Sequence, residues 1–296
     1  MKPIKALVVG GTGYLGRHLV KYLGEIGYEV YISGSKPLMI PNYYQINFED
    51  RSTFENLNGE KFEIVLILAA KLNSLGKINL NHSDLRLNTI DYANFLEYLK
   101  ENNTTQKIIY TSSMTVYSEQ NPSPVKEDDV IAPVNTYGLS KYLAENITSF
   151  FCHRNEIKGA ILRLPGIYGG DRQSGLIYNI IKKAINHETV EVNTQGLIYW
   201  ETIYVHDLCK MIISFLKNYD WENDIDIFNL SYGEETDVLE TVHFIKENLQ
   251  SESIIKEESK KGYRQFYLSN KKAKKFIHLN SSYHSSLISY LNTFEL

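Results

Sequence analysis

The sequence predicts an α/β fold in which a Rossmann-type, doubly wound parallel sheet is joined to a smaller, mixed C-terminal lobe. In the first half of the chain, short apolar runs alternate with longer amphipathic stretches, as in βαβ units. These runs are apolar throughout, as expected of strands that helices cover on both faces. We therefore expect a dinucleotide-binding domain over residues 1–169. Residues 170–296 should form mainly a substrate-binding lobe, from which part of 198–230 returns to the first domain.

The individual elements are predicted from apolar periodicity. In the first half we expect strands at 4–9, 29–33, 64–68, 107–111 and 160–164, and helices at 14–26, 85–101 and 137–155. After Gly169 the alternation becomes irregular, with helices expected at 176–186, 207–217, 238–249 and 285–293, and strands at 198–205 and 226–230. Asp207 is expected to cap its helix. Because ligands of doubly wound sheets bind at the carboxyl ends of the strands, the C-terminal lobe is suited to selecting a substrate there.

The composition argues against several classes of partner. The chain has 296 residues and a formal net charge of −4, which gives no reason to expect nucleic acid or an anionic membrane as a partner. Its longest apolar run, residues 64–70, fits a buried strand rather than a membrane span. Cys152 and Cys209 are expected to be isolated buried thiols, and no residues have the spacing of metal ligands. We expect a soluble, cytoplasmic protein without a metal.

A glycine-rich loop follows the first predicted strand and precedes a helix. Glycines at 10, 13 and 16 permit a tight turn, close approach of the backbone to a pyrophosphate, and close helix–strand packing. The helix N-terminus then offers N–H groups and a positive dipole end to the phosphates. This context favours a dinucleotide site over a purely structural turn. The residues of the loop predicted to contact the cofactor are Gly10, Thr12, Gly13, Tyr14, Leu15 and Gly16.

The end of the second predicted strand bears on the choice between NAD and NADP. An acidic residue there would bind the ribose hydroxyls of NAD, but the sequence reads Ile32-Ser33-Gly34-Ser35-Lys36. Two hydroxyls and an ammonium suit a 2′-phosphate, which a carboxylate would repel. We therefore predict contacts from Ser33, Ser35 and Lys36, with NADP(H) preferred and NAD(H) still possible.

Three residues form a candidate catalytic set. Ser113 follows the strand at 107–111, while Tyr137 and Lys141 stand four residues apart at the start of a helix and therefore share one face of it. A nearby ammonium should lower the pKa of the tyrosine. The set can exchange a proton with a hydroxyl or carbonyl while a nicotinamide exchanges hydride with the carbon.

With these motifs the chain resembles the extended short-chain dehydrogenases/reductases, the NAD-dependent epimerase/dehydratase family. Smaller matches add to the resemblance. They are Asn47-Phe48-Glu49-Asp50 on the adenine side, Leu68-Ala69-Ala70 at a strand end, Asn88 in a helix, the segments Arg163–Gly169 and Ile203–Leu208, and Thr111 and Leu164 near the cofactor.

The resemblance implies catalytic roles for Ser113, Tyr137 and Lys141, with Lys141 also bonded to the nicotinamide ribose. It implies nucleotide-activated sugars as substrates and, by analogy, a homodimer. Met114 and Thr115 stand where dehydratases of the family carry an Asp-Glu pair, which argues against dehydration. The missing acidic residue of the second strand and the short chain favour an NADPH-dependent 4-ketoreductase.

Several alternatives stay open. An NAD-dependent 4-epimerase is the nearest one; a non-catalytic dinucleotide sensor and a reductase of a non-nucleotide carbonyl are the others. Candidate substrate-binding residues are Thr115, Arg172 and Trp200. Trp200 replaces an arginine of the family and Gly166 an asparagine, while Lys260, Lys261 and Arg264 are further basic candidates for a diphosphate.

Overall fold

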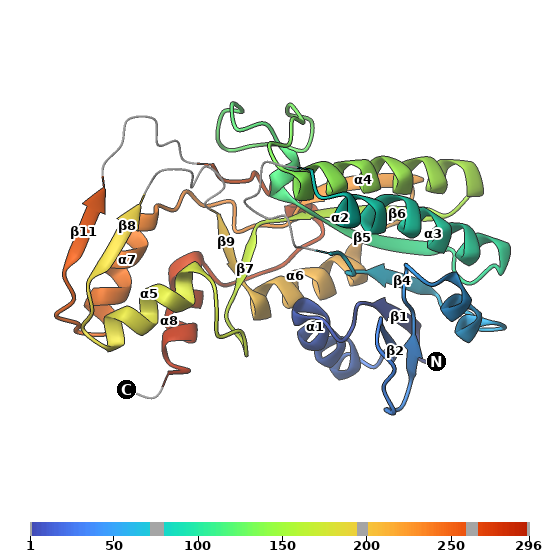
Figure 1. Cartoon of the computed structure of the whole chain (residues 1–296), viewed down its shortest axis with the longest axis horizontal. Coiled ribbons are helices and arrows are strands. Elements are labelled where there is room, and N and C mark those ends of the chain that lie inside the picture. Colours follow the sequence, from blue (N-terminus) through green and yellow to red (C-terminus); the bar gives the residue numbers. More distant parts are fainter. Residues whose placement is uncertain (1, 72–79, 194–200, 259–265, 295–296) are drawn as a thin grey trace. The chain divides into compact units, whose positions relative to one another are not determined.

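A computed structural model describes residues 2–71, 80–193, 201–258 and 266–294 of the chain (Figure 1). The chain divides into two compact units. Unit 1 consists of Met1–Ser118, Val130–Arg163 and Leu216–Phe228, and unit 2 of Glu119–Asp129, Leu164–Phe215 and Asn229–Leu296.

A seven-stranded sheet forms the centre of unit 1. Its strand order is β10-β6-β5-β4-β1-β2-β3, and the pairs from β5 through β3 are parallel. This order reverses between β1 and β4, as in a doubly wound sheet, so the predicted fold class is confirmed. The strands are β1 (Lys5–Val9), β2 (Glu29–Gly34), β3 (Tyr43–Gln45), β4 (Ile64–Ile67), β5 (Lys107–Ser113), β6 (Lys158–Leu164) and β10 (Ile225–Asn229).

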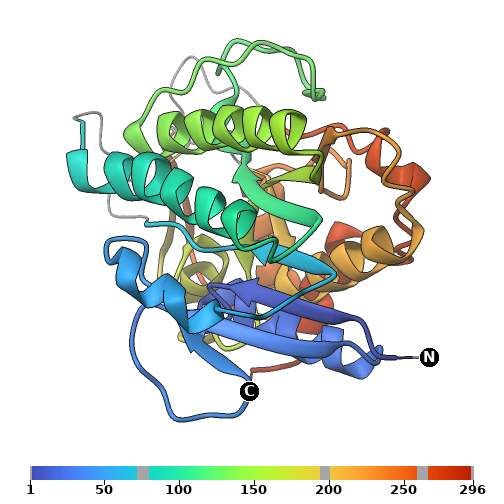
Figure 2. The same cartoon turned by 90° about the vertical axis from the view of Figure 1, so that its right-hand side faces the viewer.

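Helices pack on both faces of this sheet. Helix α1 (Tyr14–Glu25) lies on one face, whereas α3 (Tyr92–Glu101) and α4 (Thr136–Asn155) lie side by side on the other (Figures 1 and 2). Helix α1 buries Leu19 and Leu23, which are one helical turn apart, against the strands. Between the sheet and α3, Phe95 packs against Phe54 in a core that is fully closed to solvent. Apolar burial of this kind is the main force that fixes the carboxyl ends of the strands in place.

The predicted helix over 85–101 is three consecutive elements in the structure. They are α2 (His82–Arg86), a π-helical turn η2 (Leu87–Asp91) and α3. Prediction from periodicity also omitted β3 and the 3-10 helix η1 (Arg51–Leu57), which are too short to show a clear period. Single π-turns often occur at functional sites, and this one contains Asn88.

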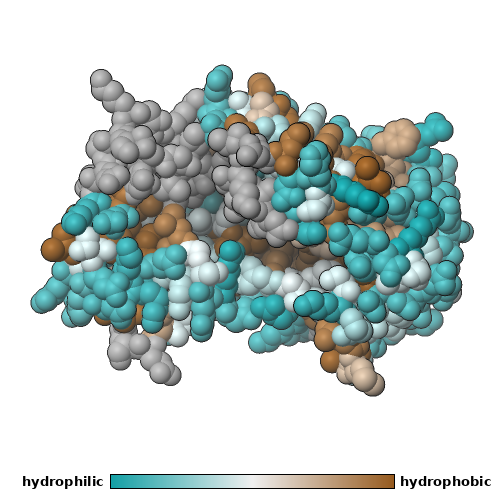
Figure 3. Space-filling model, viewed as in Figure 1, coloured by the Kyte–Doolittle hydropathy of each residue, from teal (hydrophilic) through white to brown (hydrophobic). Residues whose placement is uncertain are grey.

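The face shown in Figure 3 is largely hydrophilic, with apolar side chains exposed over α4. Leu143 and Phe150 of α4 and Ile90 of η2 are exposed.

Cys152 and Cys209 are both buried and free, as predicted. No helix in the described part of the chain is long and apolar enough to cross a membrane.

Unit 2 is built from two small sheets and four longer helices. Strand β7 (Gly166–Tyr168) pairs in parallel with β9 (Thr202–Tyr204), and β8 (Val190–Asn193) pairs in parallel with β11 (Ile255–Glu258). The helices are α5 (Leu176–Ile185), α6 (Val205–Asn218), α7 (Val238–Asn248) and α8 (Tyr283–Leu291), and the 3-10 turn η4 (Ala273–Lys275) precedes α8. A second 3-10 turn, η3 (Met114–Val116), follows β5 in unit 1. Part of the strand predicted at 198–205 lies outside the described residues.

The prediction that Asp207 caps a helix is wrong. Helix α6 begins at Val205, so Asp207 is its third residue, and it is only 2% exposed. Its Oδ2 accepts hydrogen bonds from the hydroxyls of Tyr232 (2.9 Å) and Ser286. Asp207 therefore joins α6 to two other segments of unit 2. A carboxylate in a helix's first turn is also favoured by the helix dipole.

Candidate active site

The glycine loop between β1 and α1 is a tight backbone turn. Gly10 has φ of +85°, and any Cβ there would lie 2.8 Å from the amide nitrogen of Ala69. A Cβ at Gly16 would overlap the carbonyl oxygen of Gly10. These two positions therefore admit only glycine, one because of its left-handed conformation and the other because helix and loop touch.

The start of α1 faces this turn without a side-chain cap. Gly13 is the N-cap residue, and the guanidinium of Arg17 donates to the carbonyl of Thr12 (3.1 Å). Backbone N–H groups of a helix's first turn lack intrahelical acceptors, so an uncapped start is suited to bind a phosphate. The loop and helix thus fit the pyrophosphate of a dinucleotide.

The end of β2 has no carboxylate, and Gly34 stands there against the glycine loop. A Cβ on Gly34 would lie 2.5 Å from Oγ1 of Thr12, so a larger residue requires the Thr12 side chain to shift. Ser33 is 0% exposed and its Oγ has no hydrogen-bond partner within the described chain, although its carbonyl accepts from the N–H of Gly10 (3.1 Å). Of the three residues predicted here, only Ser35 and Lys36 have exposed side chains.

Tyr43 is a residue of this region that sequence reasoning missed. Its hydroxyl lies within hydrogen-bonding distance of the carbonyls of Gly34 (3.0 Å) and Lys36 and can donate its one hydrogen to either. Gln45 adds a bond from its side-chain amide to the carbonyl of Ser35 (3.3 Å). The two β3 side chains hold the backbone at 34–36 beside the glycine loop. Tyr43 lies ten residues beyond the predicted strand at 29–33, so no local pattern in the sequence pointed to it.

The motifs at the ends of β3 and β4 have different exposures. Phe48 is buried in the unit 1 core, where it stacks on Phe95 with ring centroids 5.1 Å apart, so only its backbone is open to a cofactor. Asn47 is half-buried and its Oδ1 accepts from the N–H of Glu49 (3.2 Å). After β4, Leu68 and Ala69 are half-buried and Ala70 is exposed.

Asn88 links the end of β4 to α4. Its side-chain amide exchanges two hydrogen bonds with the backbone of Lys71 (2.8 and 3.0 Å) and donates a third to Oγ of Ser140 (3.0 Å). Ser140 in turn donates to the carbonyl of Tyr137 (2.8 Å). The π-turn that carries Asn88 therefore braces the first turn of α4.

Ser113 ends β5, and Tyr137 and Lys141 follow on α4 in the same unit. The Ser113 side chain caps η3 by accepting from the N–H of Thr115 (3.2 Å). Helix α4 is capped by Asn135, whose Oδ1 accepts from the N–H of Gly138 (2.8 Å). A Cβ on Gly138 would overlap the carbonyl oxygen of Thr115. The start of α4 thus packs directly on the loop after β5, which brings the elements carrying the predicted set together.

The predicted lowering of the Tyr137 pKa is wrong for the chain alone. Burial raises the pKa of Tyr137 to about 12, because a phenolate is poorly solvated there. Burial also lowers the pKa of Lys141 to about 7, an effect that the carboxylate of Glu145 partly opposes. Lys141 is 2% exposed and its Nζ lies 4.4 Å from the ring centroid of Tyr110. Tyr137 therefore holds its proton at neutral pH.

A buried ion pair behind Lys141 was not foreseen from the sequence. Arg163 binds both carboxylate oxygens of Glu145 (Nε to Oε1 3.0 Å, Nη2 to Oε2 2.7 Å), and its Nη1 donates to the hydroxyl of Tyr117 (2.8 Å). The guanidinium also lies 4.7 Å from the centre of the Tyr117 ring. This pair joins α4, β6 and the loop after β5. An arginine inside a buried strand and a glutamate one turn after Lys141 were the signals.

The predicted residues of the C-terminal half are only partly described. Leu164 ends β6 and is buried, and Arg172 donates from Nη1 to the carbonyl of Ile167 and from Nε to Oγ of Ser174 (both 3.3 Å). Trp200, Lys260, Lys261 and Arg264 lie outside the described residues. No group of three His, Cys, Asp or Glu residues in the described ranges can hold a metal ion.

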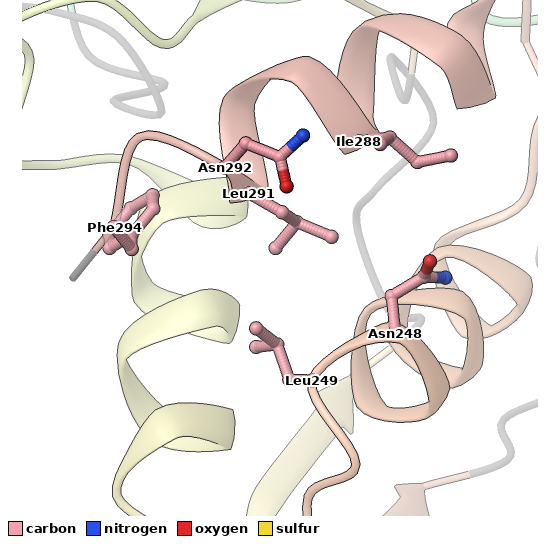
Figure 4. A pocket seen from close by; sticks show the side chains of 6 residues that line it. All are labelled: Asn248, Leu249, Ile288, Leu291, Asn292 and Phe294. Carbon is pink, nitrogen blue, oxygen red and sulfur yellow. The ribbon is translucent and has the colours of Figure 1, made fainter. Parts of the chain in front are cut away.

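Two surface pockets contain none of the predicted site residues. One in unit 2, of about 250 Å³, lies between the ends of α7 and α8, where Leu249 and Leu291 face one another (Figure 4). It is lined by Asn248, Leu249, Ile288, Leu291, Asn292 and Phe294, which include no acid, base or nucleophile. The other, of about 410 Å³, lies in unit 1 beside the amino ends of β4 and β5. That edge of the sheet is opposite to the one at which doubly wound folds bind ligands.

Comparison with known proteins agrees with this fold. Residues 6–231 match the NAD dependent epimerase/dehydratase family. A putative UDP-glucose 4-epimerase of Methanocaldococcus jannaschii is 30% identical over 281 residues, which cover 90% of each chain. A dTDP-4-dehydro-6-deoxyglucose reductase of Escherichia coli is 26% identical, covering 84% of this chain and 83% of the relative. The crystal structure of a UDP-glucose 4-epimerase of Thermotoga maritima with UDP-glucose has a TM-score of 0.81 and 24% identity, covering 98% of both chains.

The fold and the matches define an NAD(P)-dependent enzyme of the short-chain dehydrogenase/reductase type. The chain belongs to the NAD dependent epimerase/dehydratase family.

Proposed function

We propose that the enzyme reduces the 4-keto group of a nucleotide-activated sugar, with NADPH as reductant, Tyr137 as proton donor, and Ser113 and Lys141 as its catalytic partners. The observation that favours NADPH, and through it reduction, is the end of β2, where the segment Ile32–Lys36 has no carboxylate and Gly34 stands against Oγ1 of Thr12. A site without that carboxylate accepts the 2′-phosphate of NADPH beside the exposed Ser35 and Lys36.

The proposed chemistry follows from the protonation of the site. Because burial keeps the pKa of Tyr137 near 12, its hydroxyl is a proton donor at neutral pH, as reduction of a ketone requires. NADPH, when bound, supplies the hydride to the carbonyl carbon. Tyr137 gives its proton to the carbonyl oxygen and becomes a phenolate. Lys141, when it is protonated, stabilises that phenolate. Asn88 and Ser140 hold the backbone of Tyr137 in place.

The cofactor is proposed to bind along the carboxyl edge of the unit 1 sheet. Gly10, Gly13 and Gly16 give the backbone access to the pyrophosphate. Residues proposed to line the rest of the cofactor are Thr12, Tyr14, Leu15, Ser35, Lys36, Asn47, Phe48 through its backbone, Leu68, Ala69, Ala70, Asn88, Thr111 and Leu164. Ser33 contributes only indirectly, because its side chain is fully buried and its carbonyl accepts from the N–H of Gly10 in the glycine loop.

A 4-epimerase is the second candidate, and the relative from M. jannaschii favours it. Chain length, which the sequence suggested as an argument against epimerases, does not separate the two reactions. The T. maritima epimerase matches this chain over 98% of both lengths. An epimerase oxidises and then reduces the same carbon, so it returns its cofactor to the starting state and needs no added reductant.

The test combines a spectrum of the protein as isolated with calorimetry of NADPH and NADH. We expect an initially empty site and tighter binding of NADPH, followed by NADPH oxidation when dTDP-4-dehydro-6-deoxyglucose is added. The double variant Ser35→Ala, Lys36→Ala should weaken NADPH binding and leave NADH binding unchanged, which makes NADH the matched control. Co-purified NAD(H) together with conversion of UDP-glucose to UDP-galactose would overturn the proposal in favour of epimerase.

We also propose that residues 170–296 select the substrate, with Arg172 and Trp200 among its contacts.

We further propose that the enzyme is a homodimer. The exposed Ile90, Leu143 and Phe150 support a protein interface there, because η2 and α4 contact one another and large exposed apolar side chains favour association. Sedimentation velocity of the purified enzyme distinguishes a dimer from a monomer, and a monomer at all concentrations would contradict this part.

A further inference from the structure

The hydroxyl of Ser113 already accepts two hydrogen bonds from within its own loop. The N–H of Thr115 donates to Ser113 Oγ over 3.2 Å, and the hydroxyl of Thr115 donates to the same oxygen over 3.0 Å. Ser113 itself is half-buried, whereas Thr115 is only 8% exposed. Both donors come from one residue of η3, the single turn that Ser113 caps.

These two hydrogen bonds determine whether the Ser113 hydroxyl can donate or accept a further one. A serine hydroxyl has two acceptor lone pairs and one donor hydrogen. With both lone pairs engaged by Thr115, Ser113 can only donate its hydrogen. We propose that Thr115 is a positioning residue, which holds the Ser113 hydroxyl as a committed donor to the substrate oxygen. This inference rests on the proposed function, in which Ser113 bonds the 4-oxygen of the sugar.

The hydroxyls of Ser113 and Tyr137 therefore have different roles in the reduction. During reduction the carbonyl carbon gains the hydride and its oxygen gains negative charge, which the Ser113 hydrogen bond stabilises. The proton that completes the alcohol comes from Tyr137, whose O–H bond breaks as the new O–H bond forms. Ser113 has no lone pair left to accept a proton from Tyr137, so the transfer runs directly from Tyr137 to the sugar oxygen.

Packing keeps Thr115 in this role. Met114 and Val116 on either side of it are buried, and the carbonyl of Thr115 abuts Gly138 so closely that a Cβ there would overlap it. Gly138 follows Tyr137 directly in α4. The backbone that orients Ser113 is thereby in contact with the backbone that carries Tyr137, which fixes the two hydroxyl-bearing segments relative to one another.

A direct contact between Thr115 and the substrate, the role expected from the sequence, makes a different prediction. A substrate contact contributes to binding in the ground state, so its loss raises KM. A positioning residue acts through Ser113, so its loss lowers kcat and has no further effect once the Ser113 hydroxyl is absent. The two roles are separable by kinetics.

The experiment compares Thr115→Val, Thr115→Ser, Ser113→Ala and the double variant Ser113→Ala, Thr115→Val in the oxidation of NADPH by dTDP-4-dehydro-6-deoxyglucose. Valine keeps the shape of threonine without its hydroxyl, and serine keeps the hydroxyl. We expect Thr115→Val to lower kcat about 10-fold, the effect of misorienting one hydrogen bond in the transition state, with little change in KM. Thr115→Ser should restore most of kcat. The double variant should match Ser113→Ala alone.

Three results would overturn the inference. They are a Thr115→Val enzyme with normal kcat, one in which only KM rises, and a double variant whose loss is the product of the two single losses. Thermal unfolding of each variant, with calorimetry of NADPH, excludes a general loss of structure. If Ser113→Ala keeps full turnover, the role of Ser113 in the proposed function fails as well. If Ser113→Ala is inactive while Thr115→Val is normal, only the inference fails.

Discussion

Units 1 and 2 each contain a buried glutamate, and the two glutamates differ in whether an arginine is paired with them. Glu145 in unit 1 meets the guanidinium of Arg163 in a two-point ion pair, with both side chains about 3% exposed. Glu201 in unit 2 is 2% exposed, accepts from the N–H of Leu268 (2.7 Å) with Oε2, and has no partner for Oε1 within the described chain. Burial raises the pKa of Glu201 to about 8, so it is protonated at neutral pH.

The difference shows that burial alone does not decide whether a carboxyl carries charge. An unpaired carboxylate in a protein interior takes up a proton, whereas one held by an arginine can stay ionised. Glu145 lies one helical turn after Lys141 on α4. Its carboxylate acts to raise the pKa of Lys141, against the effect of burial. Glu201 lies in unit 2, where the nearby acid Glu234 raises its pKa further.

Removing Arg163 should have the largest effect on stability. Arg163→Met leaves Glu145 buried without its cation, and we expect a loss of about 3–5 kcal/mol in the free energy of unfolding. Urea unfolding followed by circular dichroism measures it. The matched control is the double variant Arg163→Met, Glu145→Met, which removes both charges and should recover much of the loss. A single variant as stable as the wild type would mean that Glu145 needs no partner, and the contrast with Glu201 would disappear.

The pH dependence of stability should reveal Glu201. Its pKa is about 8 in the folded chain, against an ordinary value of 4.5, so between these values the folded state binds one more proton than the unfolded state. The free energy of unfolding should therefore fall as pH rises from about 5 to about 8, by up to about 1.4 kcal/mol per pH unit from this group. Glu201→Gln cannot titrate and should lack this component. Parallel pH profiles for the wild type and the variant would show that Glu201 is not protonated in the folded enzyme.

The elements with strong local patterns were predictable from the sequence. The glycine loop has a fixed backbone requirement at Gly10 and Gly16, and strands such as β1 and β4 are apolar runs that precede or follow periodic helices. Both signals lie within one short segment of chain. The spacing of Tyr137 and Lys141 on one turn of α4 is local as well, whereas their partnership with Ser113 on another element stays a prediction.

What the sequence did not predict depends on residues far apart in the chain. The raised pKa of Tyr137 is a property of the protein packed around its ring, and no spacing along α4 reports it. Arg163 and Glu145 are 18 residues apart, and the hydroxyls that bond to Asp207 are 25 and 79 residues away from it. Short elements such as β3 and β7 have too few residues for a period.

The most direct test of the central claim is the turnover of Tyr137→Phe with NADPH and dTDP-4-dehydro-6-deoxyglucose. Phenylalanine keeps the ring and removes the proton, so NADPH should bind as in the wild type by calorimetry. Loss of a general acid lowers kcat by about 100- to 10,000-fold, and we expect a loss in that range. A Tyr137→Phe enzyme that binds NADPH and turns over at the wild-type rate would contradict the account, because the sugar oxygen would then be taking its proton from elsewhere.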